Sequence, residues 1–166
     1  RWLLFLMVPA TLTGSIINSF KDALAASVVL TGFIPMLMDT GGNAGSQASV
    51  SIVRGLSLGE IEYRDVWRII WKEARVAVLC GVTLAAANFV KLLLLDRVEL
   101  GVAIVVCSTL VLTVLVAKLV GCVLPIVAKR IGFDPAVMAS PFITTIVDAL
   151  SLLIYFQIAC AVLHIG

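Results

Sequence analysis

Polar side chains recur at helical spacing inside the apolar stretch SPFITTIVDALSLLIYF, residues 140–156. Steps of three and four residues place on one helix face Ser140, Thr144, Asp148 and Ser151. A carboxylate at the centre of a membrane helix costs on the order of 2.5–3.5 kcal/mol, so it is tolerated where it meets a cavity, a partner or an ion. Hydroxyl groups can simply join helices. The carboxylate of Asp148 instead favours the lining of a pore.

A second polar run, PMLMDTGGNAGSQ at residues 35–47, has the same kind of spacing. Steps of four place on one face Asp39, Asn43 and Gln47. Pro35 removes a backbone donor, so we expect it to loosen the helix and free carbonyl oxygens. Such carbonyls, together with amide oxygens, bind ions in the discontinuous helices of transporters.

Three glycines interrupt this second run, Gly41, Gly42 and Gly45. They add flexibility to the helix. Gly41 and Gly45 also have the GxxxG spacing that lets membrane helices pack closely. A packing seam and a pore face can coexist on one helix, so both interpretations stay open.

Oxygen ligands of this kind predict a hard divalent cation rather than zinc or copper. One or two carboxylates among neutral oxygens suit Mg²⁺, which gives up its water ligands reluctantly; Mn²⁺, Co²⁺ and Ca²⁺ are further candidates. The predicted metal ligands are Asp148, Asp39, Asn43 and Thr144. The predicted pore-lining residues are Ser140, Thr145, Ser151, Gly41, Gly42, Gly45 and Gln47.

The histidine and cysteine side chains are not predicted to be ligands of this metal site. The single histidine, His164, lies at the C-terminal end and is interpreted as a boundary residue. Four cysteines lie singly in apolar runs without a CxxC pair, so we interpret them as buried packing residues, with disulfides or a zinc site as alternatives. They are Cys80, Cys107, Cys122 and Cys160.

The composition predicts an all-α integral membrane protein. Of the 166 residues, 61% are hydrophobic and 13% charged, more apolar surface than a soluble domain of this size can bury. The sequence has no basic patch interleaved with aromatic residues, the pattern that would indicate nucleic-acid binding.

A bilayer core of roughly 30 Å needs about 20 apolar residues per helix. Five segments qualify, at about residues 2–20, 24–53, 74–95, 101–125 and 136–163. The first resembles a signal peptide ending in ALAAS, but the spans that follow favour a first transmembrane helix.

Lysine and arginine are distributed unevenly between the loops of this five-span protein. Eight lie at the N-terminus and in the second-to-third and fourth-to-fifth connections, against three on the opposite side. The positive-inside rule then predicts a multi-pass cell-membrane protein with a cytoplasmic N-terminus and an external C-terminus.

The loop before the third span contains YRDVWRIIWKEARV, in which charged residues alternate with apolar ones. We interpret residues 60–73 as an amphipathic helix lying in the membrane interface, with its tryptophans at the headgroup level. Anchoring is the favoured role, and binding of a partner is the alternative.

The position of Asp148 also predicts a homodimer. One carboxylate per chain is little charge, and five helices are few to enclose a water-filled path. A two-fold axis would bring two copies of Asp148 together, with a divalent cation or a proton between them. A divalent ion gains roughly twice the 2.3 kcal/mol per charge that 100 mV supplies. Channel-like uptake driven by the membrane potential is therefore sufficient, with a sodium- or proton-coupled exchanger as the alternative.

Taken together, PMLMDTGGNAGSQ, VRGLSLGEI and GFDPAVMASPFITTIVDALSLLIYF resemble the membrane domain of the MgtE magnesium transporters, related to the SLC41 carriers. The resemblance covers essentially all 166 residues. It implies a homodimer of five-helix protomers whose ion path is lined by helices 2 and 5 at the dimer interface. It also implies that magnesium stays largely hydrated and that Asp148 selects the ion.

The sequence departs from the family at some positions. Some members carry Asn in place of Ser140 and a small residue in place of Thr144, and Asp39 is not a position that the family requires. The cytoplasmic acidic domain and paired CBS domains that sense magnesium in many members have no counterpart in these 166 residues, so closure by them is not assumed.

Two other classes of function compete with transport. DTGG and two membrane aspartates suggest an intramembrane aspartyl protease, but the YD and GxGD motifs of such enzymes are not present. A structural membrane module with a polar seam is the third interpretation. The sequence therefore predicts a transporter and not an enzyme.

Overall fold

The computed structural model describes residues 2–136 and 141–164, and all regular structure in them is helical. Five helices have 18 residues or more: α1 (Trp2–Ser19), α3 (Ile34–Ser57), α4 (Val66–Leu94), α5 (Leu100–Arg130) and α6 (Pro141–Leu163). Shorter pieces connect them: α2 (Lys21–Ala26) and the 3₁₀ turns η1 (Val28–Phe33) and η2 (Tyr63–Asp65).

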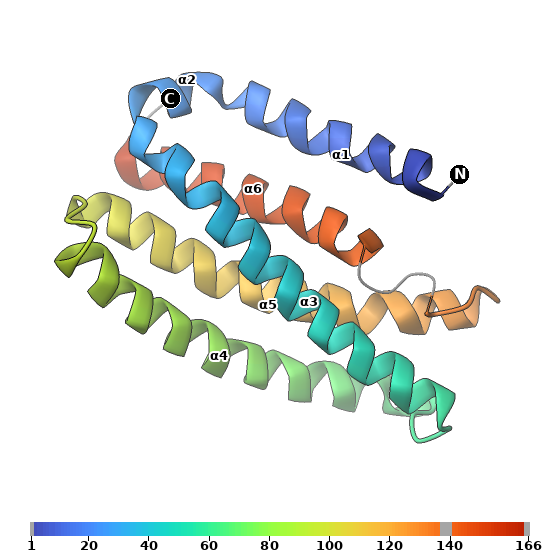
Figure 1. Cartoon of the computed structure of the whole chain (residues 1–166). Helices are drawn as coiled ribbons and strands as arrows, with labels where there is room; N and C mark the ends of the chain where they lie inside the picture. The colour runs from blue at the N-terminus through green and yellow to red at the C-terminus, as the bar shows by residue number, and fades with distance from the viewer. Residues whose placement is uncertain (1, 137–140, 165–166) are drawn as a thin grey trace.

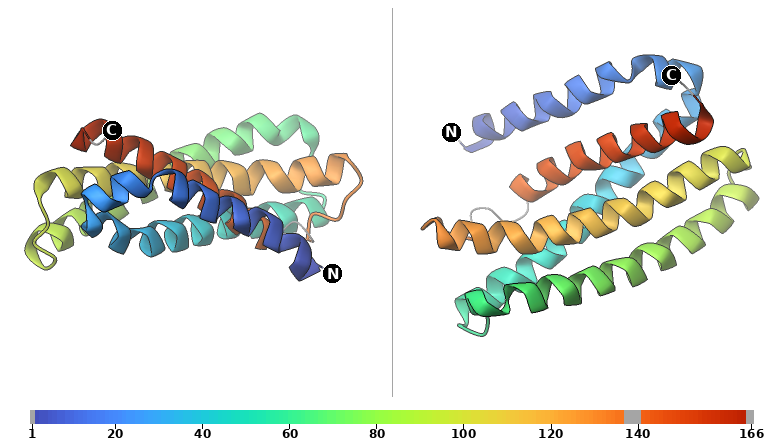
Figure 2. Two further views of the ribbon diagram at one scale, coloured as in Figure 1. Left: turned by 90° about the horizontal axis from the view of Figure 1, so that it is seen from above. Right: turned by 180° about the vertical axis from the view of Figure 1, so that it is seen from behind.

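Four of the long helices form a layer that α3 crosses. The layer has the spatial order α1, α6, α5, α4, and α3 runs obliquely over one of its faces (Figure 1). Viewed from behind, the same four helices lie in front of α3 (Figure 2). Helix α5 packs against α3, α4 and α6 and is the centre of the molecule. Helix α1 begins and α6 ends at opposite ends of the bundle (Figure 1).

Within the described residues, three helices are long and apolar enough to cross a membrane: α4, α5 and α6. Their most apolar windows have mean hydropathies of 2.0, 2.7 and 2.2. This confirms that the described residues are all-helical, with three helices whose length and composition suit a membrane span. Helices α1 and α3 are not among these three, and the polar run of α3 lowers its hydropathy. That these two helices also span the bilayer stays a prediction.

A buried hydrogen bond fastens the segment before α3 to α6. Tyr155 in α6 is fully buried, and its hydroxyl donates to the carbonyl oxygen of Leu30 at 2.8 Å. Beside it, the rings of Phe20 and Phe156 stack with their centroids 4.8 Å apart. These contacts set the position at which α3 enters the bundle.

The predicted continuous helix over residues 24–53 is wrong. The chain leaves the α-helix at Ser27, tightens into the 3₁₀ turn η1 and starts α3 at Ile34. Val28, Val29 and Thr31 are β-branched and favour helices weakly. Pro35 lies in the first turn of α3, where its missing N–H costs nothing, so it starts the helix rather than loosening it.

The predicted interfacial helix over residues 60–73 is likewise not separate. From Val66 onward these residues are the first turns of α4, which continues without a break to Leu94. Neither Gly nor Pro lies between Val66 and Cys80, so nothing in the sequence ends the helix where the bilayer begins.

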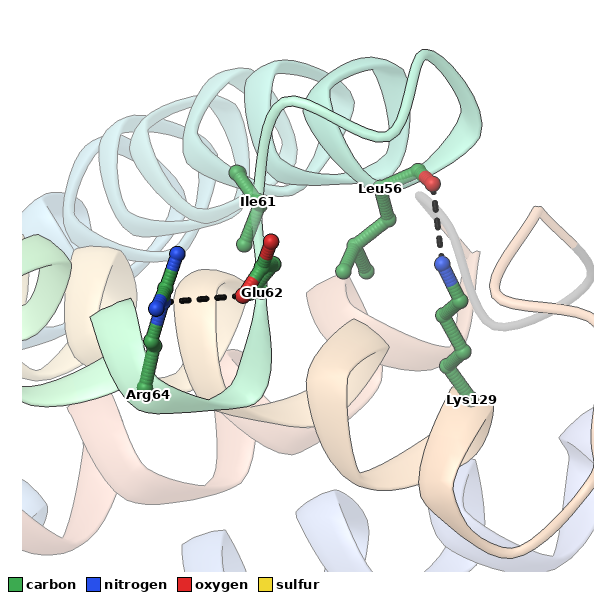
Figure 3. A pocket seen from close by; sticks show the side chains of 5 residues that line it. All are labelled: Leu56, Ile61, Glu62, Arg64 and Lys129. Carbon is green, nitrogen blue, oxygen red and sulfur yellow. Dashed lines mark hydrogen bonds and ion pairs between the residues drawn. The ribbon is translucent and has the colours of Figure 1, made fainter.

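Helix α5 is longer than the predicted 101–125. It continues through Pro125 to Arg130, and Ile126 and Ala128 beyond the proline are buried. Next to them, the ammonium group of Lys129 donates to the carbonyl of Leu56 at 2.8 Å and so caps the C-terminal end of α3. A pocket of about 330 Å³ lies here, and its other charged side chains, Glu62 and Arg64, pair with each other at 2.8 Å (Figure 3).

Candidate functional site

The polar side chains of α3 that were predicted to share a face do so. Asp39, Asn43 and Gln47 follow one another at single helical turns, and all three are exposed. The opposite side of α3 is buried against α5 and α6, through residues that include Leu37 and Ala48. On a single chain, the polar side of α3 therefore has no protein cover from the described residues.

Helix α6 contributes a second polar strip that borders the first. Asp148, Thr144 and Thr145 are all half-buried. The hydroxyls of Thr144 and Thr145 donate to the carbonyl of Pro141, at 3.0 and 2.7 Å. Because their protons are used within the helix, these oxygens keep only lone pairs to offer, which suits a cation or the water around it.

The two strips meet where α3 crosses α6. Gly42 lies against Thr144, with 3.1 Å between the position a Cβ would take and the Thr144 Cγ2 atom. The Asp39 and Asp148 carboxylates are close enough to interact electrostatically, as like charges. We call this continuous surface the polar face; it consists of Asp39, Asn43, Gln47, Thr144, Thr145 and Asp148.

The glycines of α3 lie behind the polar face, not on it. Gly41, Gly42 and Gly45 are buried. A Cβ on Gly41 would lie 2.7 Å from Thr113 Cγ2, and one on Gly45 would lie 3.1 Å from the Ala117 carbonyl oxygen. These glycines form a packing seam, because the missing side chains let α3 approach α5 and α6. Their predicted place in the pore lining stays a prediction.

Another predicted pore-lining residue, Ser151, is not on the polar face. Ser151 is 2% exposed, its hydroxyl donates to the Val147 carbonyl at 2.6 Å, and it faces Gly41. It shares the buried side of α6 because its three-residue step from Asp148 turns it towards α3 and α5. Ser140 lies outside the described residues.

Two buried hydroxyl groups of α5 were not predicted from the sequence, and one of them, on Thr113, lies behind Gly41. Thr109 and Thr113 are fully or almost fully buried, and their hydroxyl oxygens have no hydrogen-bond partner among the described groups. The signal available was a pair of threonines four residues apart in an apolar run. Thr113 lies against Gly41 and so takes part in the α3–α5 contact.

The histidine and cysteines are remote from this chemistry. His164 is exposed at the end of α6, and all four cysteines are free thiols. Cys122 is buried, as predicted, but Cys80 is exposed. The prediction fails for Cys80 because α4 packs on the bundle through one side only, which includes Ala77 and Gly81.

The carboxylates are too few to strip an ion of its water. Among the described residues, no three Asp, Glu, His or Cys side chains come together in a way that could hold a metal. The polar face combines two carboxylates with amide and hydroxyl groups. Such a set can bind the water shell of a hard cation, or complete a site when a second copy of the face is added.

A sequence model of the MgtE family, described as a divalent cation transporter, matches residues 34–158. The match starts at the first residue of α3 and ends within α6, so it includes the whole polar face. The chain belongs to the MgtE family.

Relatives named magnesium transporter MgtE support this assignment. The chain is 38% identical over 164 residues to the Bacillus subtilis protein, covering 98% of this chain and 36% of the relative. It is 37% identical over 163 residues to the Thermus thermophilus protein, covering 96% and 35%. The Enterococcus faecalis protein is 32% identical over 161 residues, covering 95% and 35%.

These similarities confirm the resemblance seen in the sequence. The chain spans about a third of the length of these MgtE relatives. All three are named as transporters, which agrees with the expectation of a non-enzyme and gives the protease alternative no support.

Proposed function

We propose that this chain forms the ion-conducting part of a homodimeric magnesium transporter. The observation that carries the proposal is the place of Asp148. It lies half-buried in an apolar helix, within electrostatic range of the Asp39 carboxylate and about one helical turn from Thr144 and Thr145. A carboxylate at this depth is costly unless it serves an ion or a partner.

The open side of the polar face supports the dimer. Asp39, Asn43 and Gln47 are exposed on a helix inside a membrane domain, and lipid tails cannot satisfy their hydrogen-bonding groups. A second copy related by a two-fold axis would cover the same surface on both chains. Residues of α3 and α6 from both protomers would then enclose one central path.

The chemistry of that path follows from its ligands. Two protomers would contribute two copies of Asp148 and two of Asp39, whose mutual repulsion is relieved when a divalent cation lies between them. Mg²⁺ would keep most of its water, which donates to the carboxylates and to the oxygens of Asn43 and Thr144. The hydroxyl of Thr144, where some family members have a small residue, adds one acceptor per chain to this water shell.

Uptake requires no second ion. Each charge that crosses 100 mV gains about 2.3 kcal/mol, so Mg²⁺ gains roughly twice that from an inside-negative potential. We therefore propose a channel-like route, with Asp148 as the central ion-binding residue. The proposed orientation puts the start of α1 and the basic α3–α4 connection in the cytoplasm, in line with the positive-inside rule.

Flux measurements test the site directly. Proteoliposomes with the wild-type chain, Asp148→Asn or the control Asp96→Asn would be given an imposed potential, without sodium or proton gradients. Asp96 is an exposed carboxylate outside the polar face, paired with Lys91 at 2.7 Å, so it controls for loss of an acid as such. We expect magnesium flux in the wild type and in Asp96→Asn, and at least a tenfold loss in Asp148→Asn.

The other outcomes discriminate among the alternatives. Flux that starts only when a sodium or proton gradient is added would replace the channel by a coupled exchanger. Undiminished flux in Asp148→Asn would remove this residue from the ion path. Absence of flux in every condition, from a chain that is folded and dimeric, would favour a structural module.

A further inference from the structure

The first turns of α4 carry three basic side chains on one face. Arg68, Lys72 and Arg75 recur at steps of four and three and all are exposed. Within residues 2–136 and 141–164, none of them has an ion pair or hydrogen bond to another side chain. This contrasts with Arg64, which is paired with Glu62 in the neighbouring pocket (Figure 3).

These three residues line a polar pocket of about 730 Å³. Its acidic members are Glu60 and Asp65, so basic side chains outnumber acidic ones by three to two. The carboxylate of Asp65 already accepts a hydrogen bond from the backbone N–H of Glu62, at 3.3 Å. An anion in the pocket would therefore meet three cations without internal partners.

An apolar groove of about 490 Å³ continues from this pocket along α4. Its walls come from both α4 and α5, and it is lined by Trp71, Ala74, Arg75, Val78, Leu79 and Leu115. Trp71 and Arg75 belong to both the pocket and the groove. The basic cluster, which consists of Arg68, Lys72 and Arg75, and the apolar groove are thus two ends of one surface feature.

The depth of this feature fits one leaflet of a bilayer. Helix α4 has 29 residues and is about 43 Å long, some 13 Å more than the hydrocarbon core needs. The excess is about nine residues and accommodates the segment from Val66 to Ala74 at headgroup level. Trp67 and Trp71, 81% and 66% exposed, are residues typical of that level. From Arg68 to Leu79 the helix rises about 16 Å, so the feature extends from headgroup level into one leaflet, with roughly the last 8 Å, past Ala74, inside the core.

We propose that this surface binds one phospholipid with a net negative charge. Arg68, Lys72 and Arg75 hold its phosphate, and one acyl chain lies in the groove beside Val78 and Leu115. Charge complementarity favours an anionic lipid over a neutral one, and the continuity of pocket and groove favours a lipid over a soluble anion. The site lies on α4, which packs in the bundle chiefly on α5, and it is separate from the polar face.

Native mass spectrometry of the purified chain tests the proposal without reference to ion flux. The chain in detergent is titrated with dioleoyl phosphatidylglycerol or dioleoyl phosphatidylcholine, and the affinity for the first bound lipid is measured. The test variant is Arg68→Gln/Lys72→Gln/Arg75→Gln. The matched control, Arg54→Gln/Arg97→Gln/Arg130→Gln, removes the same charge from three other exposed positions.

The wild type should bind phosphatidylglycerol at least tenfold more tightly than phosphatidylcholine. The test variant should lose roughly 100-fold in phosphatidylglycerol affinity, the loss expected for three near-surface basic residues, whereas the control should change less than twofold. A second variant, Val78→Phe, keeps every charge and fills the groove, so it should weaken both lipids several-fold.

Three results would overturn the proposal. Equal binding of phosphatidylglycerol by the test variant and the wild type would show that the three basic residues do not hold the lipid, and would favour a protein segment as their partner. An equal loss in the control would show a general charge effect rather than a site. Unchanged binding in Val78→Phe would exclude the groove, and this variant covers the case in which the triple variant does not fold.

Discussion

Gly121 is the position at which the α3–α5 contact is tightest, and we predict that Gly121→Ala separates these helices. The new Cβ would overlap the Gly45 carbonyl oxygen and would lie 3.0 Å from the carbonyl carbon of Gly45 and 3.1 Å from the Ala48 Cβ. The first two obstacles are backbone atoms, so no side chain can rotate to make room. Helix α3 must move away from α5, and it carries Asp39 and Asn43 with it.

The size of the effect follows from this overlap. Restoring an ordinary carbon–oxygen contact needs a displacement of about 1 Å, and a gap of that size forfeits a quarter to a half of the dispersion energy of each contact along the seam. Overpacking of a core typically costs about 1–3 kcal/mol. Because the clash is with backbone, we place the cost at about 2–3 kcal/mol, at the top of that range. The melting temperature should fall by roughly 5–10 °C for a chain of this length.

Thermal unfolding in detergent and magnesium flux in liposomes measure the two consequences. The control is Gly14→Ala in α1, where a Cβ would meet nothing within 4 Å. It should leave flux unchanged and raise stability slightly, by about 0.5–1 kcal/mol, since alanine suits a helix interior better than glycine. Equal melting temperatures for Gly121→Ala and Gly14→Ala would refute the close approach of α3 and α5. A lower melting temperature with normal flux would show that the position of α3 does not control the ion path.

Two other predictions concern buried polar contacts. Tyr155→Phe leaves the Leu30 carbonyl without its donor, so we expect a loss of about 1–3 kcal/mol and a lower melting temperature; an unchanged value would mean that the 2.8 Å bond contributes nothing. Lys118 in α5 and Glu73 in α4 pair at 3.2 Å, with side chains 12% and 18% exposed. Glu73→Gln should lower the free energy of unfolding by about 3–5 kcal/mol, because it leaves the buried charge of Lys118 without a partner. Glu73→Leu/Lys118→Met should recover most of that loss in the same unfolding assay, and a double variant as unstable as Glu73→Gln would contradict an isolated pair.

Much of the candidate site was predictable because it depends on local repeats. Asp39, Asn43 and Gln47 lie one helical turn apart, and any helix through them shows them on one side. The same holds for Thr144 and Asp148 in α6. Whether the helices are long and apolar enough for a membrane also follows from consecutive residues, and α4, α5 and α6 meet that expectation.

Helix boundaries were less predictable where two local signals compete. Pro35 is compatible with a kink inside a long helix and with the first turn of a new one. Burial of Leu30 and the hydrogen bond from Tyr155, both made by α6, hold η1 in place and select the second arrangement. Likewise, the aromatic and charged residues from Val66 to Glu73 are compatible with an interfacial helix, but here they extend α4.

The sequence by itself determined the class of protein, the residue types that could hold a hard cation and their helical faces, because composition and spacing are properties of one segment. Only the tertiary structure decided which polar and small residues are open and which are packed. Gly41 and Gly45 are buried because α5 and α6 approach them, and Ser151 of α6 is buried against α3, whereas Asp39 and Asn43 on the same helix as the glycines are exposed. That difference arises from contacts between residues about 70 to 110 positions apart in the chain, which no local pattern specifies.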